Sequence, residues 1–177
     1  MRMKELIDKA AIDRTLKRMA HEILEKSPNY QDIVLVGIKT RGEYLAQRLQ
    51  KKLQLIEGVE FPLETVDISF YRDDLSKLAE DPQINNKDWQ TNLNDKRLVL
   101  VDDVLYTGRT IRAAMDAIMD DFRPRRIELA ILVDRGHREL PIRADYIGKN
   151  IPTSKTERVQ VQLEEVDGHD QVVLSND

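Results

Sequence analysis

The chain has 177 residues, 41% of them hydrophobic and 34% charged, with a formal net charge of −4. This balance excludes intrinsic disorder, and the length suits one domain over residues 1–177. The chain has no cysteine and no apolar run near the ~18 residues of a membrane span, which excludes disulfides, thiolate chemistry and a transmembrane helix. Its charged N-terminus lacks a signal-peptide core, so we expect a cytoplasmic protein with no membrane partner.

The first predicted element is an amphipathic helix over residues 12–26, which Ser27-Pro28-Asn29 ends. Its apolar face repeats at helical spacing through Ile12, Leu16, Met19 and Ile23. Another face, at spacings i, i+3, i+4 and i+7, is basic and consists of Arg14, Lys17, Arg18 and His21. Such a face is usually solvated surface, and contact with nucleic-acid phosphates is the functional alternative.

A strand, a loop and a helix follow. Residues 32–38 form a continuous apolar run, residues 39–42 are the loop, and residues 43–56 have the period of a helix. Residues 61–71 alternate between apolar and polar side chains and predict another strand. Residues 73–96 are polar and have no clear period. A loop of this length in a compact domain is usually functional or mobile.

The most informative stretch is residues 98–110. Its four leading apolar residues suit a strand buried on both faces, and Asp102 and Asp103 follow at the carboxyl end. An amphipathic run over residues 111–122 comes next, and the residues just before it include Thr107, Gly108 and Thr110. The unpaired amides and the dipole of a helix start favour an anion such as phosphate. Gly108 lets the backbone approach the anion, and the hydroxyls add donors.

The acid pair decides what kind of anion fits. Two carboxylates beside an anion site repel the anion unless they face ribose hydroxyls or a metal ion. The stretch therefore predicts a site for a sugar that carries phosphate. The alternative is a strand whose acids cap the next helix, which is the better interpretation for an acid pair taken alone.

The rest of the chain continues the alternation of strands and helices. Short apolar runs predict strands over residues 127–133 and 144–147. Residues 159–163 and 172–174 predict an antiparallel pair around a turn at residues 167–169.

Strands that alternate with helices predict an α/β fold with a parallel sheet. Ligands in such sheets bind beyond the carboxyl ends of the strands. The loops over residues 39–42, 102–110 and 134–140 all fall there, so we expect them to converge on one cleft.

These motifs resemble a known family. Residues 98–110 resemble the 5-phosphoribosyl-1-pyrophosphate (PRPP) motif of type I phosphoribosyltransferases: four apolar residues, two acids and Thr-Gly-x-Thr. Residues 38–42, 71–75 and 133–149 resemble the PyrR family, whose members combine pyrimidine operon attenuation with uracil phosphoribosyltransferase activity. The similarity covers nearly the whole chain. It implies the type I phosphoribosyltransferase fold, a central mostly parallel sheet flanked by helices, with a flexible hood loop over roughly residues 71–96.

The resemblance implies roles for individual residues. Asp102 and Asp103 meet the 2- and 3-hydroxyls of the PRPP ribose in this scheme and, together with Arg41, are the catalytic set. The loop that follows the acids holds the 5-phosphate. The residues implied to bind PRPP or UMP are Thr40, Arg41, Arg72, Asp102, Asp103, Val104, Leu105, Tyr106, Thr107, Gly108, Arg109, Thr110, Arg135 and Val159.

Some of these residues also have plain structural alternatives. Thr40 and Arg41 resemble the pyrophosphate loop, which often carries a cis peptide bond before its second residue; taken alone, they fit a helix N-cap and a solvated Arg. Arg72 resembles part of the hood and would bring positive charge to the pyrophosphate, or else it pairs on the surface with Asp73 or Asp74.

The base is implied to bind near Arg135 and Val159. An Arg side chain can stack its plane on a base. Uracil presents two carbonyls and an N–H, which backbone groups near Val159 can read without a charged side chain.

The implied reaction is uracil plus PRPP giving UMP and pyrophosphate. No covalent nucleophile is needed, and Mg²⁺ is expected to be held mainly through PRPP. No metal site within the protein itself is predicted, since the histidines are too dispersed: His21, His137 and His169.

A second implied function is binding of pyrimidine operon leader mRNA. The basic helix face is joined in the resemblance by Arg138, Arg143 and Lys149. Lys17 departs from the family pattern, where a Thr commonly stands. The alternatives are a salvage transferase without RNA regulation and a regulator that catalyses little. The resemblance also suggests homodimers that pair further.

Overall fold

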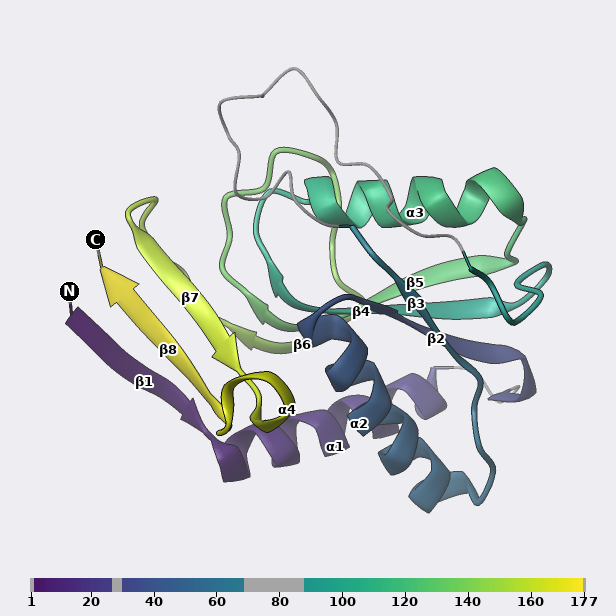
Figure 1. Ribbon diagram of the computed structural model, residues 1–177, viewed down its shortest axis with the longest axis horizontal. Coiled ribbons are helices and arrows are strands. Elements are labelled where there is room, and N and C mark those ends of the chain that lie inside the picture. The colour runs from purple at the N-terminus through teal and green to yellow at the C-terminus, as the bar shows by residue number, and fades with distance from the viewer. Residues whose placement is uncertain (1, 27–29, 69–87, 177) are drawn as a thin grey trace.

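The computed structural model describes residues 2–26, 30–68 and 88–176, arranged as Figure 1 shows. In chain order the elements are β1 (Arg2–Asp8), α1 (Lys9–Glu25), β2 (Ile33–Ile38), α2 (Arg41–Glu57), β3 (Leu63–Val66), β4 (Arg97–Leu105), α3 (Arg109–Asp121), β5 (Arg126–Asp134), β6 (Tyr146–Asn150), β7 (Glu157–Gln162), α4 (Glu164–Asp167) and β8 (Gln171–Asn176). A 3-10 turn over Tyr30–Asp32 precedes β2. Among these residues, no helix is long and apolar enough to cross a bilayer.

The central sheet has five parallel strands in the order β3-β2-β4-β5-β6. Helices α1 and α2 cover one face and α3 covers the other (Figure 1). This explains why β2 and the first half of β4 are unbroken apolar runs, because a strand covered on both faces has no solvent side. The predicted α/β fold with a mostly parallel sheet is confirmed.

A second sheet stands beside the carboxyl ends of the parallel strands. It is antiparallel, with the order β1-β8-β7, and the hairpin of β7 and β8 was predicted from the sequence. Strand β1 was not predicted, because its polar and charged residues leave Ile7 as its buried side chain. Asp8 then caps α1 by accepting a hydrogen bond from the Ala11 amide at 2.8 Å. The helix therefore begins at Lys9 rather than at residue 12.

Other predicted boundaries shift by a few residues. Strand β4 runs through the acid pair to Leu105 instead of ending before it, and β6 begins at Tyr146 rather than at residue 144. Of the predicted strand over residues 61–71, residues 63–66 form β3, and residues 69–71 lie outside the described residues. Most of the predicted hood also lies outside them, and its described part, residues 88–96, contains no helix or strand.

A buried ion pair lies at the amino-terminal ends of the parallel strands. The Arg97 Nε donates to Glu128 Oε1 at 2.8 Å, and both side chains are almost fully buried. Arg97 Nη2 also donates to the Ile23 carbonyl and to the Tyr146 hydroxyl, which in turn donates to Glu128. Burial and the hydrogen bond to Glu128 raise the pKa of Tyr146. One cluster thus joins the end of α1 to β4, β5 and β6.

We predict that Glu128→Ala lowers the free energy of unfolding by about 3 kcal/mol, because it leaves the Arg97 charge buried without its carboxylate. Urea denaturation followed by circular dichroism measures the change. The control is Arg126→Ala, which removes a half-exposed cation from the same carboxylate and is expected to cost less than about 1 kcal/mol. Equal losses in the two variants would contradict the assignment.

Candidate functional site

Two of the three predicted loops meet directly beyond the carboxyl ends of β4 and β5. The Leu105 carbonyl accepts from the Arg135 amide at 3.1 Å. The Thr107 carbonyl accepts from the amides of Glu139 and Leu140 at 2.9 and 3.2 Å. The loop after β5 is therefore hydrogen-bonded along the loop after β4.

The third loop, after β2, reaches the same place because two glycines allow it. A Cβ on Gly42 would lie 2.5 Å from the Val101 carbonyl oxygen and 3.2 Å from Asp102 Oδ1. A Cβ on Gly37 would lie 2.7 Å from the Cα of Glu43. The first turn of α2 therefore lies directly against the end of β4, and the expected convergence of the loops is confirmed.

The acid pair is held at this junction. Asp102 is buried and Asp103 is half-buried. In each residue Oδ1 accepts the amide of the next residue, at 2.9 Å for Asp102 and 2.8 Å for Asp103. The N-cap position of α3 is Gly108, and that helix has no side-chain cap among the described residues. The alternative in which the acids cap the next helix is therefore wrong.

The loop that leads into α3 has the form of an anion site. Gly108 has φ +94°, a conformation that favours glycine. The Thr107 hydroxyl accepts from the Arg109 amide at 3.2 Å, while the Arg109 side chain turns to Glu139. The N-cap residue Gly108 has no side chain that could cap α3, so the first-turn amides beyond Arg109 can receive an anion.

The other residues of the predicted phosphate stretch are divided between core and surface. Leu105 is buried in the core under α3, so a ligand can meet its backbone but not its side chain. Val104 packs on the opposite face of the sheet, Thr110 is half-buried in the first turn of α3, and Tyr106 is exposed.

The loop predicted to bind pyrophosphate does contain a cis peptide bond, between Lys39 and Thr40. Thr40 occupies the N-cap position of α2 without a side-chain hydrogen bond there. Arg41 is not a solvated side chain, since its Nη2 and Nε donate to Asp167 Oδ1 and Oδ2 at 2.7 and 3.3 Å. Of the structural alternative, the N-cap position of Thr40 is therefore present, although its side chain makes no capping hydrogen bond, and the solvated Arg is not.

The segment that carries Asp167 is tied to α2 at a second place. Arg48 forms ion pairs with Asp170 at 2.8 Å and with Glu165 at 2.5 Å. The hydrogen bond from Arg48 lowers the pKa of Asp170 and that of Glu165, and the same contacts raise the pKa of Arg48. Burial raises the pKa of Asp167, but hydrogen bonds from Arg41 and the Leu163 amide outweigh burial and leave the pKa below its ordinary value.

Arg135 is more enclosed than the sequence suggested. Its guanidinium donates to the Thr153 hydroxyl and to the carbonyls of Ser154 and Glu157. The Tyr106 ring covers it, with Cζ 4.0 Å from the ring centroid. Arg135 therefore fixes the segment that leads into β7, which carries the buried Val159, and the aromatic cover over it was not found from the sequence.

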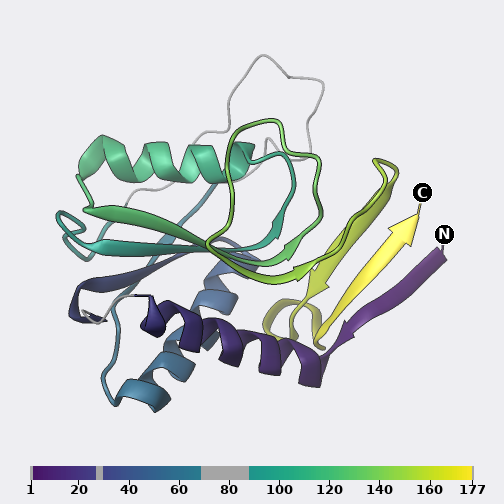
Figure 2. The same ribbon diagram turned by 180° about the vertical axis from the view of Figure 1, so that it is seen from behind.

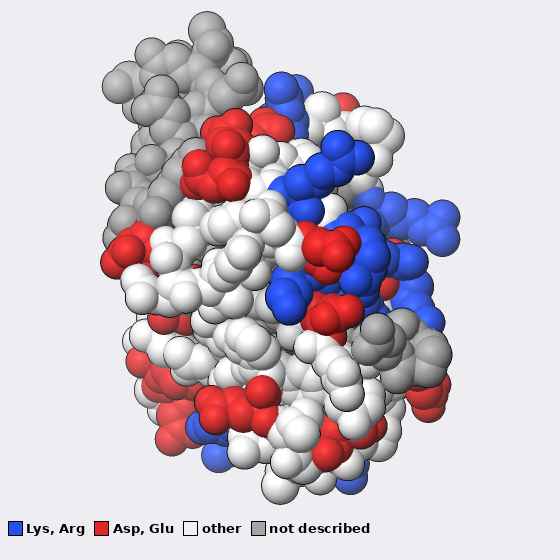
Figure 3. Space-filling model, turned by 90° about the vertical axis from the view of Figure 1, so that its right-hand side faces the viewer, with Lys and Arg blue, Asp and Glu red and all other residues white. Residues whose placement is uncertain are grey.

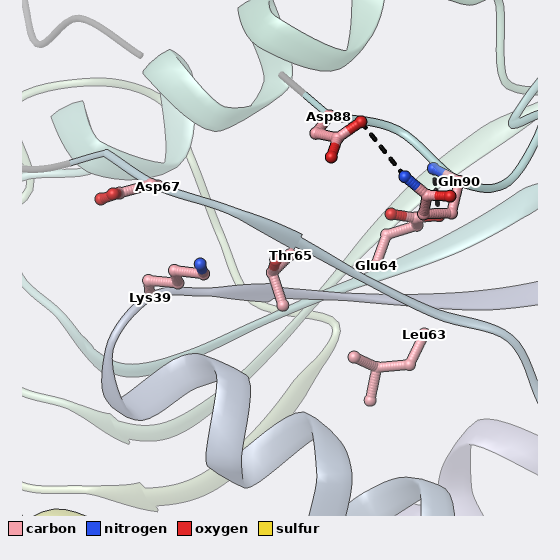
Figure 4. Close-up of a pocket in the computed structure, with 7 residues that line it drawn as sticks. All are labelled: Lys39, Leu63, Glu64, Thr65, Asp67, Asp88 and Gln90. Atoms are coloured by element: carbon pink, nitrogen blue, oxygen red, sulfur yellow. Dashed lines mark hydrogen bonds between the residues drawn. The ribbon is translucent and has the colours of Figure 1, made fainter. Parts of the chain in front are cut away.

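A polar cavity of about 300 Å³ adjoins the pyrophosphate loop along the edge strand β3 (Figure 4). Lys39 stands at its loop end, and Glu64, Asp67 and Asp88 bring carboxylates to it. The backbone amide of Gln90 donates to Glu64 Oε1 at 3.0 Å. The predicted hood residue Arg72 lies outside the described residues.

The predicted RNA-binding residues do not form a single set. Helix α1, purple in Figure 2, packs its apolar side chains against the sheet, and its Arg18 donates to the β6 carbonyls of Ile147 and Gly148 at 3.2 and 2.7 Å. Arg14, Lys17 and His21 are exposed on α1, Arg143 is exposed just before β6, and Lys149 is exposed within β6. Arg138 differs, because it donates to the Ile142 and Tyr106 carbonyls and to Asp134, so it joins the cleft loops.

Basic side chains also gather where β4 and β5 begin, where Figure 3 shows lysines and arginines interspersed with acids. Arg125 and Lys96 pair with Asp32 at 3.2 and 3.8 Å, and Lys26 pairs with Asp145 at 3.2 Å. These pairs offset much of the positive charge at this edge. No group of three or more His, Cys, Asp or Glu within residues 2–26, 30–68 and 88–176 could hold a metal ion.

Comparisons with known proteins agree with this geometry. The family model described as the phosphoribosyl transferase domain matches residues 3–166. The Enterococcus faecalis strain OG1RF protein named bifunctional protein pyrR is 56% identical over 175 residues, which cover 99% of this chain and 98% of that protein. The bifunctional protein PyrR of Oceanobacillus iheyensis is 58% identical over 172 residues, covering 96% of each chain.

Solved structures show the same fold at low sequence identity. A hypoxanthine-guanine phosphoribosyltransferase from Bacillus anthracis has a TM-score of 0.77 at 19% identity, covering 97% of each chain. A hypoxanthine phosphoribosyltransferase from Staphylococcus aureus has a TM-score of 0.75 at 20% identity, covering 98% of this chain and 92% of that one.

We predict that the tether between α2 and α4 weakens in acid. A carboxylate with a depressed folded-state pKa contributes stability above its unfolded pKa, which is 3.8 for Asp170, and loses it as the pH falls through the folded value. Asp170→Asn should therefore cost about 2 kcal/mol at pH 7 and progressively less below pH ~4. Urea midpoints measured from pH 7 to pH 3 test this, and a pH-independent cost would contradict it.

Proposed function

The chain belongs to the PyrR family of phosphoribosyltransferases, and from that premise we propose that it transfers the phosphoribosyl group of PRPP to uracil and binds pyrimidine operon leader mRNA. The observation that carries the enzymatic part is the junction where β4 ends. There an acid pair, a helix N-terminus without a side-chain cap and the glycine-packed start of α2 meet within one hydrogen-bonded set of loops.

In this proposal each part of PRPP binds a different surface of the site. The 5-phosphate accepts hydrogen bonds from the first-turn amides of α3, which Gly108 leaves accessible. The ribose hydroxyls face Asp103, whose Oδ1 is already engaged by the Val104 amide, so Oδ2 receives them. The pyrophosphate lies toward the loop of Lys39 and Thr40, beside the Arg41 cation.

The chemistry follows from this placement. As the bond to pyrophosphate breaks, positive charge develops on the ribose ring, and nearby carboxylates stabilise it. Holding two substrates in line removes much of the entropic barrier, so the site needs no covalent nucleophile. Uracil reaches ribose C1 from the side of β7, where backbone groups near Val159 read its carbonyls and N–H.

Magnesium fits this site as a partner of PRPP. The half-buried Asp103 carboxylate is the hard oxygen ligand that Mg²⁺ prefers, directly or through water. When bound, the ion neutralises charge on the leaving pyrophosphate. The protein contributes the orientation of the carboxylate through the Val104 amide.

We predict that Asp103→Asn lowers kcat about a hundredfold while the fold stays intact, because it removes negative charge next to the reacting ribose. A labelled-uracil assay with PRPP and Mg²⁺ measures the rate. Asp116→Asn, on the exposed face of α3, is the matched control and should keep the wild-type rate. A wild-type rate in Asp103→Asn would refute the assigned role.

The exposed face of α1 supports the RNA-binding part. Arg14, Lys17 and His21 lie on it, and Arg143 and Lys149 come from the neighbouring β6 segment. Phosphate contacts from such a patch give affinity, and unpaired bases in an RNA loop give sequence preference. We further propose that UMP in the cleft tightens RNA binding, since both events would report that pyrimidines are sufficient.

We predict that the affinity for leader RNA falls with salt at a log–log slope near −3, from about four single-strand phosphate contacts. Arg14→Ala should weaken binding and reduce the slope by ~0.7, because one contact is lost. Filter-binding titrations at several salt concentrations, with and without UMP, measure both effects.

The control for this titration is Lys51→Ala, an exposed lysine on α2, which should change neither affinity nor slope. Equal affinity with and without UMP would end the coupling hypothesis. No detectable binding to the leader RNA would leave the salvage transferase without RNA regulation as the function.

A further inference from the structure

The Arg41 guanidinium is held by a carboxylate from a distant part of the chain. Arg41 opens α2 next to the cis peptide bond, and Asp167 ends α4 between the two last strands of the antiparallel sheet. The contact is two-pronged, with Nη2 to Oδ1 at 2.7 Å and Nε to Oδ2 at 3.3 Å. Such a pair fixes the plane of the guanidinium as well as its position.

Asp167 is itself firmly placed. Its Oδ2 accepts from the Leu163 amide at 2.8 Å, and its side chain is 20% exposed. Because Nε and one N–H of Nη2 carry the pair, the two N–H groups of Nη1 and the second N–H of Nη2 remain for a ligand. An Arg side chain carries ~2 kcal/mol of rotamer entropy, so an Arg that is already oriented binds an anion at lower entropic cost.

This contact is not needed to dock α4 on α2. Arg48, two turns further along α2, already binds the same segment through Glu165 and Asp170. Because Arg48 already docks this segment, the Arg41–Asp167 pair, which lies next to the predicted pyrophosphate loop, is available for another role.

We propose that Asp167 is a positioning residue that holds Arg41 in the orientation that receives the pyrophosphate of PRPP. This rests on the proposed function only in that PRPP binds at this junction. The antiparallel sheet, which brings β7 and Val159 to the base, thereby also sets the cation on the pyrophosphate side. The Arg41–Asp167 ion pair thus joins the start of α2 directly to the antiparallel sheet.

The test is a double-mutant cycle read by PRPP binding. Calorimetry with PRPP and Mg²⁺ gives Kd for wild type, Asp167→Asn, Arg41→Ala and the double variant. Asn keeps an acceptor for the Leu163 amide but removes the charge that orients Arg41. Asp167→Asn should raise Kd about tenfold, and in the Arg41→Ala background it should raise Kd no further, because Asp167 acts through Arg41.

The matched control is Asp170→Asn, which breaks the Arg48 pair in the same segment and should leave Kd for PRPP unchanged. In the steady state, Asp167→Asn should raise KM for PRPP while KM for uracil changes little. An unchanged Kd in Asp167→Asn, additive effects in the double variant, or an equal loss in Asp170→Asn would overturn the proposal, the last by showing a general structural role.

The outcomes also separate this proposal from the proposed function. If the wild-type protein binds PRPP but does not transfer the phosphoribosyl group to uracil, the enzymatic assignment is wrong. The double-mutant cycle read by PRPP binding would still decide the role of Asp167. A wild-type protein that does not bind PRPP would overturn both.

Discussion

The site depends on the close packing of the start of α2 against the end of β4. At Gly42 no side chain fits between the helix backbone and the Val101 carbonyl, so this contact places the pyrophosphate loop and the acid pair together. Gly37 provides the same clearance on β2. A Cβ on Gly42 would push the first turn of α2 away from Val101 and Asp102 at the end of β4. The geometry of the site is therefore set by backbone packing before side-chain chemistry contributes.

The two ends of the parallel strands are built in different ways. At the amino-terminal ends, Arg97, Glu128 and Tyr146 form a buried charged network that joins β4, β5, β6 and α1. At the carboxyl ends, polar groups are held by backbone amides and by a partly exposed ion pair. The buried network at the amino-terminal ends of the strands stabilises the sheet. Polar groups at the carboxyl ends can therefore keep hydrogen-bonding capacity for a ligand.

The sequence predicted what is local and missed what is distant. Residues 98–110 are contiguous, so their spacing alone predicted the strand, the acid pair, the glycine and the start of the helix. The Arg41–Asp167 pair joins positions 126 residues apart, and Asp167 lies in α4, a short helix where the sequence predicted only a turn. Strand β1 was missed because its stability comes from pairing with β8. The polar residues of β1 do not themselves indicate that pairing. The cover of Tyr106 over Arg135 likewise exists only once two loops have met.

The cleft and the α1 face are joined by a short run of contacts. Arg138 connects the Tyr106 carbonyl in the phosphate loop to Asp134 and Ile142, and the chain continues from there to Arg143 and β6. Arg18 then links β6 to α1. Adjacency alone does not couple two sites, because a ligand shifts an equilibrium only by its differential affinity for two arrangements. Through these contacts Arg138 holds the segment of residues 134–143 against the loop after β4, and that segment leads into β6. For the coupling proposed above, Arg138 would act by holding this segment, whether or not it also contacts RNA.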